Sequence, residues 1–277
     1  MTQIAFLRSR REGCLADTRN RWDTAMESGR DASLQQLYPC DRCPLNARPN
    51  FDTHTDAQQH FLKGFKRGEL QVGANSNFLV EGASSPHLYT VLSGWAYRYK
   101  TMEDGRRQIL NYVLPGDFLG LQSSLFGKMD HSVQALTRMV LCVFERSDLS
   151  RLFSSSSDLS YDIVWLASRE EQMVEEHLLS IGRRTALERA AYLIAFLHDR
   201  ARRTGLLEQG APLSPITQTH VADTLGMSLV HTNKTLRKLQ EDRSIRWSGK
   251  SCYVMDPEAL RRTAGWKGLP DVNRPFI

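Results

Sequence analysis

Polar and basic side chains gather on one face of a short predicted helix, Leu229–Gln240. Asn233 carries an amide that can pair with adenine, and Lys234 carries an ammonium that can donate to guanine or to phosphate. Val230 and Arg237 follow the same three- and four-residue spacing, so they share this face. A helix in a protein interior seldom carries such a set. The pattern therefore predicts a surface that contacts the base edges and phosphates of duplex DNA.

Two helical patterns and a tight turn would position this face. Thr217 can cap a first helix over Gln218–Leu225, and Gly226 can end it because glycine adopts positive φ without strain. Ser228 can cap the second helix. The alternative is an ordinary helical hairpin in a core, which a polar, basic second helix does not favour. A glycine-hinged pair of this kind is typical of a helix-turn-helix.

A hairpin follows the two helices. Residues 246–254 form two strand-like pieces around Ser248-Gly249, which predicts a wing. Contacts with phosphate are expected from His231 and Arg237 of the second helix, Thr217 and Gln218 of the first, and Lys250 of the wing. Residues 181–277 contain 16 Lys and Arg and 9 Asp and Glu, a net charge of +7, whereas the rest of the chain carries −2. The positive half is therefore the half expected to meet phosphates.

Composition limits the class of protein. A chain of 277 residues has room for two domains, and 41% hydrophobic with 24% charged residues is ordinary for a soluble protein. The sequence contains neither an apolar run of the roughly 20 residues that cross a bilayer nor the apolar core of a secretory signal. It also lacks GxSxG, HExxH and phosphate-loop motifs. We expect a cytoplasmic protein that is not an enzyme and has no membrane partner.

Short apolar runs alternate with glycines between Gly68 and Phe144, and Asp104-Gly105 is a strong hairpin signal. The predicted strands are Asn77–Val80, Leu88–Leu92, Trp95–Tyr99, Gln108–Leu114 and Met139–Phe144. A short helix is expected over Thr55–Phe65, and no helix of ordinary length between it and Asp148. Regularly spaced short strands predict an all-β sandwich or roll.

A long helix is predicted over Leu159–Ile181, ended by Gly182, and a second amphipathic helix over Thr185–Arg203. The first has side chains close to a heptad spacing: Leu159, Ile163, Leu166, Met173 and His177. With glutamates beside it, this stripe favours a two-helix contact between subunits. Alternatively the stripe packs on its own β domain, and both arrangements can hold at once.

The predicted fold is α+β, with an N-terminal β-roll (jelly-roll-like), a long dimerisation helix and a C-terminal winged helix-turn-helix. Its expected parts are a poorly ordered segment 1–36, a β-roll sensor domain 37–153, the dimerisation helix 154–182, the DNA-binding domain 183–262 and a tail 263–277.

This order of elements resembles the Crp/Fnr family of bacterial transcription regulators over about residues 37–262. Leu88–Trp95 looks like an early strand of the family's β-roll, Leu114–Gly120 looks like the loop that enters its effector pocket, and Ile216–Leu239 looks like its helix-turn-helix. The resemblance implies a homodimer on a near-palindromic DNA operator that adjusts transcription, often by contacting RNA polymerase. Val230 and Lys234 stand where many members have an acidic residue and arginine, so the family's familiar operators are not assumed.

The same resemblance indicates which ligands the β-roll is expected to bind. Cyclic-AMP-binding members have an acidic residue just after the position of Gly120 and an Arg-Ser pair further on, where this chain has Leu121-Gln122 and His131-Ser132. Without the guanidinium a buried phosphate loses its bidentate partner, so we expect cyclic nucleotides not to bind well.

Oxygen-sensing members hold an iron–sulfur cluster with cysteines, and here Cys40, Cys43 and Cys142 fit three ligand positions. The next expected cysteine position is Pro49, and Cys14 could replace it only if the N-terminal arm folds back. Three cysteines are one short of the usual four. The alternatives are a thiol redox sensor, a metal-binding module without a DNA role, or a Cys142 that is simply a small buried hydrophobe.

Overall fold

The computed structural model describes residues 34–48, 50–249 and 251–277. Cys14, Lys250 and nearly all of the predicted segment 1–36 lie outside them.

Two antiparallel sheets build the region between Lys66 and Glu145. The strand order of one is β1 (Lys66–Val72), β8 (Met139–Glu145), β3 (His87–Ser93) and β6 (Phe118–Leu119). The other has β2 (Asn77–Leu79), β7 (Ser132–Ala135), β4 (Ala96–Thr101) and β5 (Arg107–Val113). The predicted β-roll is confirmed. The prediction missed β1, β6 and β7, which are polar or very short.

Short helices surround the sheets. They are η1 (Cys40–Arg42), α2 (Asp56–Phe65), α3 (Leu121–Phe126), η2 (Arg146–Asp148) and α4 (Leu149–Ser155). Thr55 begins α2 with a capping box that includes Gln58, close to the predicted start. The sequence analysis missed α3, a six-residue helix between Gly120 and Gly127, both with positive φ. Glycine is favoured at both because other residues are strained there.

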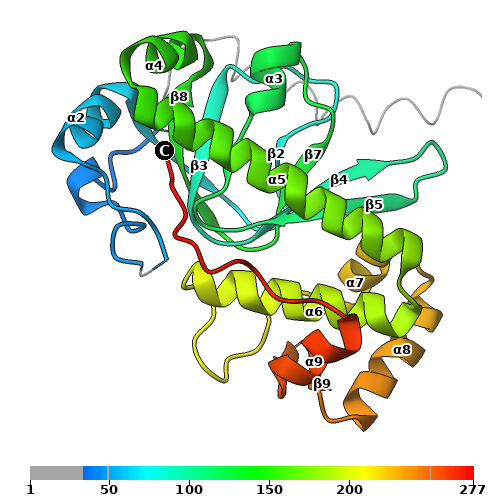
Figure 1. The fold of residues 1–277 in the computed structure, drawn as a ribbon. Helices are drawn as coiled ribbons and strands as arrows, with labels where there is room; N and C mark the ends of the chain where they lie inside the picture. Colours follow the sequence, from blue (N-terminus) through cyan, green and yellow to red (C-terminus); the bar gives the residue numbers. More distant parts are fainter. Residues whose placement is uncertain (1–33, 49, 250) are drawn as a thin grey trace, which may run out of the picture. The chain divides into compact units, whose positions relative to one another are not determined.

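The long helix α5 spans Ser157–Arg183 and lies across the β region (Figure 1). Gly182 lies inside it, so the prediction that Gly182 ends the helix is wrong; the backbone becomes extended at Arg184. The predicted heptad side chains face the chain's own interior: Leu159, Ile163, Leu166, Met173 and His177 are all buried. The stripe therefore packs on its own chain, which is one of the two arrangements that the sequence predicts; a contact of these five residues between subunits stays a prediction.

The C-terminal half starts with α6 (Ala186–Arg203), whose capping box joins Thr185 and Glu188. It continues with α7 (Gln218–Leu225), α8 (Leu229–Glu241), β9 (Ile245–Ser248), β10 (Ser251–Val254) and α9 (Pro257–Ala264). In the described part of the chain, every helix is too short or too polar to cross a membrane.

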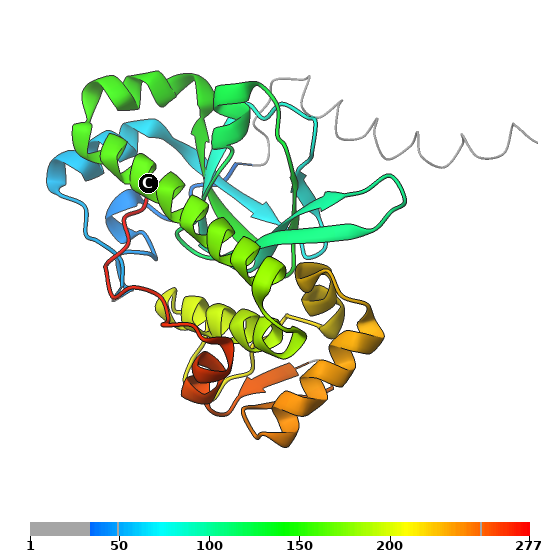
Figure 2. The ribbon, with the colours of Figure 1, turned by 45° about the vertical axis from the view of Figure 1, so that its right-hand side comes forward.

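Two apolar clusters hold these elements together. One packs α6 against α7, α8 and α9 and against Tyr97 and Tyr112 of the second sheet. The other joins the first sheet to α2, α4 and the first half of α5, and it includes Phe276 and Ile277. These last residues reach it because the chain after α9 runs back along α6 toward α2 (Figures 1 and 2). The tail is therefore part of the packed structure.

Candidate nucleic-acid interface

The helix pair has the local geometry that the sequence predicts. The Thr217 side chain accepts a hydrogen bond from the His220 backbone N–H, and Gly226 ends α7 at φ 63° and ψ 34°. The Ser228 hydroxyl then accepts from the His231 backbone N–H and starts α8. Each signal satisfies backbone groups that a helix end leaves unpaired. The helix-turn-helix is therefore set by short-range interactions.

One side of α8 holds it on the protein. Thr232, Thr235, Leu236 and Leu239 are buried. The Thr232 and Thr235 hydroxyls donate to backbone carbonyls four residues earlier, those of Ser228 and His231, so burial leaves neither hydroxyl unpaired.

The other side of α8 is open and basic. Val230 is 81% exposed, and the side chains of His231, Lys234 and Arg237 are also exposed. Within the part of the chain that the structure describes, Lys234 and Arg237 have no carboxylate within 4.0 Å. Residues 229–240 contain no Asp or Glu. The positive charge on this face is therefore available to an external anion.

Asn233 occupies the middle of this face in a half-buried position. Its Oδ1 atom is buried without a hydrogen-bond partner among the described residues. A buried polar atom left unpaired costs roughly 1–3 kcal/mol, so a turn of this amide toward the open face would be favoured.

The other predicted contacts are less exposed. Thr217 and Gln218 are partly buried at the start of α7, where the Thr217 hydroxyl is engaged in the cap. Lys250 lies outside the described residues, between the two wing strands, which pair from Ser251 with Ser248 to Val254 with Ile245. Arg246, which the sequence analysis did not select, lies 4.2 Å from the ring centroid of Tyr253. The signal that could have selected Arg246 as a contact to DNA is its position on the predicted wing strand next to an aromatic residue.

The sheet contacts the helix pair directly. Gln108 Nε2 of β5 donates to the Thr224 carbonyl at 2.8 Å, and the Tyr112 hydroxyl lies 3.0 Å from Thr224 Oγ1. Arg107 donates to Asp223 of α7. These contacts link the β region to the first helix of the pair, a connection that sequence spacing alone could not reveal.

The three candidate cysteines come together away from α8. Cys40, Cys43 and Cys142 line one small pocket, together with His54, Lys66 and Ile277. Burial raises the pKa of all three thiols above the usual value, most strongly for Cys142. Among the described residues, no three His, Cys, Asp or Glu side chains are arranged to hold a metal ion. These residues alone therefore do not fit a metal cluster.

A β-roll with a helix-turn-helix and a wing defines a class of DNA-binding proteins. Residues 69–156 match the cyclic nucleotide-binding domain, and residues 188–263 match the Crp-like helix-turn-helix domain. The nitrogen fixation regulation protein FixK of Bradyrhizobium diazoefficiens is 31% identical over 176 residues, 64% of this chain and 73% of that protein. The transcriptional activator protein FnrL of Cereibacter sphaeroides is 27% identical over 83% of this chain and 93% of its own length.

Solved structures agree with these matches. The structure of FixK2 from Bradyrhizobium japonicum has a TM-score of 0.62 at 25% identity and covers 70% of this chain and 96% of its own. The chain belongs to the Crp/Fnr family of transcriptional regulators. It is a DNA-binding regulator of transcription and not an enzyme.

Proposed function

We propose that the protein binds an inverted-repeat operator as a homodimer, with α8 of each copy in the major groove. The observation that carries this proposal is the exposed basic face of α8, held in place by its buried opposite side. Two such helices on one side of the duplex lie about 34 Å apart, one helical turn of DNA. The bound dimer would then adjust transcription, including by contact with RNA polymerase. A cytoplasmic location is part of this proposal.

The side chains on the face have separate roles in the proposal. Asn233 pairs with adenine, because an amide offers both an acceptor and a donor to the adenine edge. Its Oδ1, buried and without a partner among the described residues, has to turn toward the DNA to do so. Lys234 donates to guanine or phosphate, and Val230 touches a thymine methyl. The phosphate contacts are those of His231, Arg237, Thr217, Gln218 and Lys250. The lysine ammonium is a point charge, so Lys234 should distinguish between DNA bases less strongly than an arginine would.

Selection from a random duplex library, followed by titration at several salt concentrations, tests this assignment. Asn233→Ala should relax one operator position and cost about 1–3 kcal/mol there. Arg237→Gln should weaken binding to all DNA sequences alike. Binding should also release about one counterion fewer, which lowers its salt dependence. The matched control is Arg262→Gln, an exposed arginine on α9, which should change neither. The assignment is wrong if Asn233→Ala selects the same operator as the unaltered protein, or if the protein ignores duplexes at low salt.

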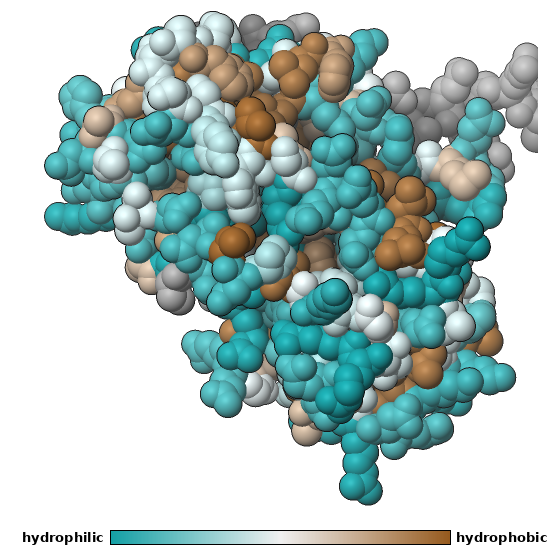
Figure 3. Space-filling view, in the orientation of Figure 1, coloured by the Kyte–Doolittle hydropathy of each residue, from teal (hydrophilic) through white to brown (hydrophobic). Residues whose placement is uncertain are grey.

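The dimer contact of this proposal uses the outer face of α5. Val164 is 56% exposed and Leu178 71%, and Val174 and Ile181 share this face. With Glu171 they continue the three- and four-residue spacing of a two-helix seam. In the view of Figure 3, brown side chains lie over the C-terminal part of α5 among teal ones. The division into parts 37–153, 154–182 and 183–262 belongs to the same proposal.

The β-roll acts in this proposal as a sensor for an input other than cyclic AMP. His131 stands where cyclic-AMP-binding members place arginine, and it is buried. Burial, with Arg98 and Lys100 nearby, lowers its pKa to about 3, so it is neutral and offers an anion no charge. Arg98 is paired with Glu170 of α5 at 3.1 Å. A binding titration with cyclic AMP should show no micromolar affinity, and a micromolar affinity would refute this part.

A second candidate input is oxygen or redox state, sensed by cysteines that control the same DNA binding. The observation in its favour is the shared pocket of Cys40, Cys43 and Cys142. A cluster would need a further ligand, for which Cys14, outside the described residues, is the remaining candidate; a thiol switch would not. Purification without oxygen, followed by iron analysis and an absorption spectrum, separates the two. Iron bound in the unaltered protein and lost in Cys142→Ser would support the cluster, whereas colourless, iron-free protein would exclude it.

A further inference from the structure

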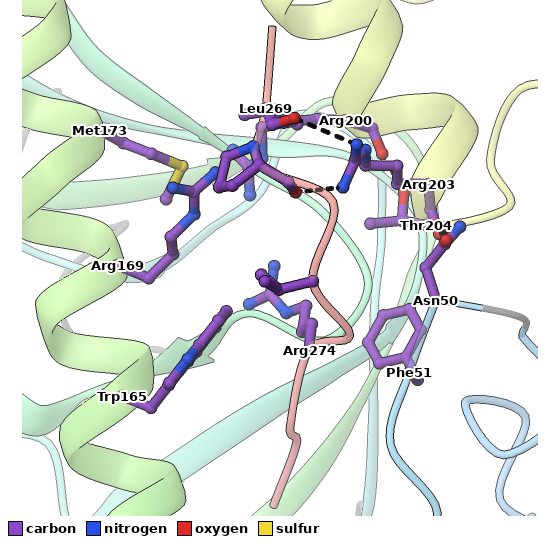
Figure 4. A pocket seen from close by; sticks show the side chains of 12 residues that line it. Asn50, Phe51, Trp165, Arg169, Met173, Arg200, Arg203, Thr204, Leu269 and Arg274 are labelled. Atoms are coloured by element: carbon purple, nitrogen blue, oxygen red, sulfur yellow. Dashed lines mark hydrogen bonds between the residues drawn. The ribbon is translucent and has the colours of Figure 1, made fainter.

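A second pocket lies where α5, α6, the tail and residues 50–51 meet, outside the interior of the β-roll (Figure 4). Figure 4 shows Trp165 and Arg169 of α5 on one side, Arg200 and Arg203 of α6 on another, and Arg274 of the tail between them. Four guanidinium groups thus surround one hollow.

One carboxylate serves two of these four arginines. Asp117, 2% exposed, accepts from Arg200 Nη2 at 2.9 and 2.8 Å and from Arg274 Nη2 at 2.8 Å. Arg203 donates to the backbone carbonyls of Pro270 and Leu269. Its Nη2 atom lies 3.8 Å from a carboxylate oxygen of Asp271, whose side chain is fully exposed to solvent. The groups around the pocket therefore carry more positive charge than Asp117 can balance.

Arg169 adds to this imbalance. It hydrogen-bonds to Gln172, one turn further along α5, and has no carboxylate within 4.0 Å in the described ranges. Burial lowers its pKa, and the charges of Arg200, Arg274 and Arg203 lower it further. Arg274 Nε is buried, and none of the described residues accepts its hydrogen bond. An anion beside Arg169 would give that guanidinium the partner that it lacks, and Arg274 lines the same pocket.

The pocket also has apolar walls. Phe51 is 5% exposed, and its ring centroid lies 6.0 Å from the Arg274 guanidinium carbon. Trp165 lines the opposite side in Figure 4. A few polar groups between apolar and aromatic walls are typical of sites for small organic molecules.

We propose that this pocket binds a small organic anion, with its phosphate or carboxylate between Arg169 and Arg274 and its apolar body between Trp165 and Phe51. The inference goes beyond DNA binding and does not depend on it. It gives the Crp-type fold of this chain a ligand site outside the β-roll, built partly by the tail. Because the site joins α5 to the tail that follows α9, its ligand would fasten the DNA-binding half to the long helix.

Isothermal titration calorimetry of the 277-residue chain with phenyl phosphate, benzoate and inorganic phosphate tests the site. Phenyl phosphate or benzoate should bind at one site per chain, at least tenfold more tightly than inorganic phosphate, because only they fill the apolar part. The stronger of the two identifies the acidic group. Lack of saturable binding by both at millimolar concentration would overturn the proposal.

Variants locate the binding. Arg169→Gln should weaken the better ligand at least tenfold, and Trp165→Leu should weaken it while leaving inorganic phosphate unchanged. The matched control is Arg202→Gln, an exposed arginine next to Arg203, which should bind as the unaltered protein does. Thermal unfolding of each variant checks that it folds, and binding unchanged by Arg169→Gln would refute the site. Operator binding measured on the same samples shows separately whether the proposed function holds.

Discussion

Arg107 of β5 and Asp223 of α7 form a paired contact between the sheet and the helix-turn-helix. Arg107 Nε and Nη2 donate to Asp223 Oδ2 at 3.0 and 2.6 Å, and Nη1 donates to the Tyr97 hydroxyl at 2.6 Å. The two charged side chains are 27% and 23% exposed. They lie 116 residues apart in the sequence. Together with the contacts of Gln108 and Tyr112 to Thr224, this pair holds α7 on the β4–β5 hairpin.

The strength of this contact is measurable in a double-mutant cycle. Arg107→Gln and Asp223→Asn should each lower the free energy of unfolding by about 1–2 kcal/mol, because each leaves a partly buried charge without its partner. The double variant should lose less than the sum, giving a coupling energy of about 1 kcal/mol by urea denaturation. Asp104→Asn, at the exposed pair with Arg106, should leave stability close to that of the unaltered protein. Additive losses would mean that the two side chains do not interact.

A turn glycine offers a second test. Gly94, between β3 and β4, has φ +94°, and a Cβ there would lie 2.5 Å from the Arg138 carbonyl oxygen. Gly94→Ala should therefore cost about 2–5 kcal/mol, from backbone strain and from displaced backbone. Gly105 has φ +86° with open space around it, so Gly105→Ala should cost only the strain, about 1–2 kcal/mol. Equal losses in urea denaturation would show that the close approach to Arg138 is unimportant.

Stability should also depend on pH through His177. Burial, with Arg200 and Arg184 nearby, lowers its pKa to about 3, and its Nδ1 lies 2.9 Å from the Tyr192 hydroxyl. The unfolded chain binds a proton below about pH 6.5, whereas the folded protein does not until about pH 3. The contribution of His177 to the free energy of unfolding is therefore fully present above pH 6.5. Below that pH it is lost by up to about 1.4 kcal/mol per pH unit.

Denaturation at pH 7.5 and pH 5.0 measures this effect. His177→Gln, although less stable at pH 7.5, should lose about 2 kcal/mol less than the unaltered protein between the two pH values. His60→Gln changes an exposed histidine on α2 and should keep the full loss. An unchanged pH dependence in His177→Gln would show that this histidine does not titrate in the unfolding reaction.

The sequence predicts what neighbouring residues determine. The caps Thr217 and Ser228 and the glycine hinge Gly226 act within four residues, so both helices of the pair begin at the predicted residues. The first helix ends at Leu225, and the second runs one residue beyond the predicted Gln240. In contrast, β7 has four residues and no strong apolar alternation, and its partners are found only in the folded sheet.

Periodicity alone could not decide what α5 contacts. This helix has apolar residues on two sides, and the stripe containing Leu159 and Ile163 is buried in its own chain while the one containing Val164 and Leu178 is exposed. Either stripe satisfies a heptad pattern. The pocket around Arg169 was also beyond sequence reasoning, because Phe51, Arg169 and Arg274 meet only after folding.

The exposed stripe leads to the last prediction, on assembly. A contiguous apolar face at helical spacing on a long helix favours burial against a second copy. Leu178→Glu places a charge in this face and should weaken the dimer at least tenfold, because the charge would be desolvated in the interface. Sedimentation velocity over a range of protein concentrations measures the change. Leu125→Glu alters a similarly exposed leucine, 67% against 71%, on α3 and should leave the dimer intact. If Leu178→Glu sediments as the unaltered protein does, the subunits meet elsewhere and the outer face of α5 needs another explanation.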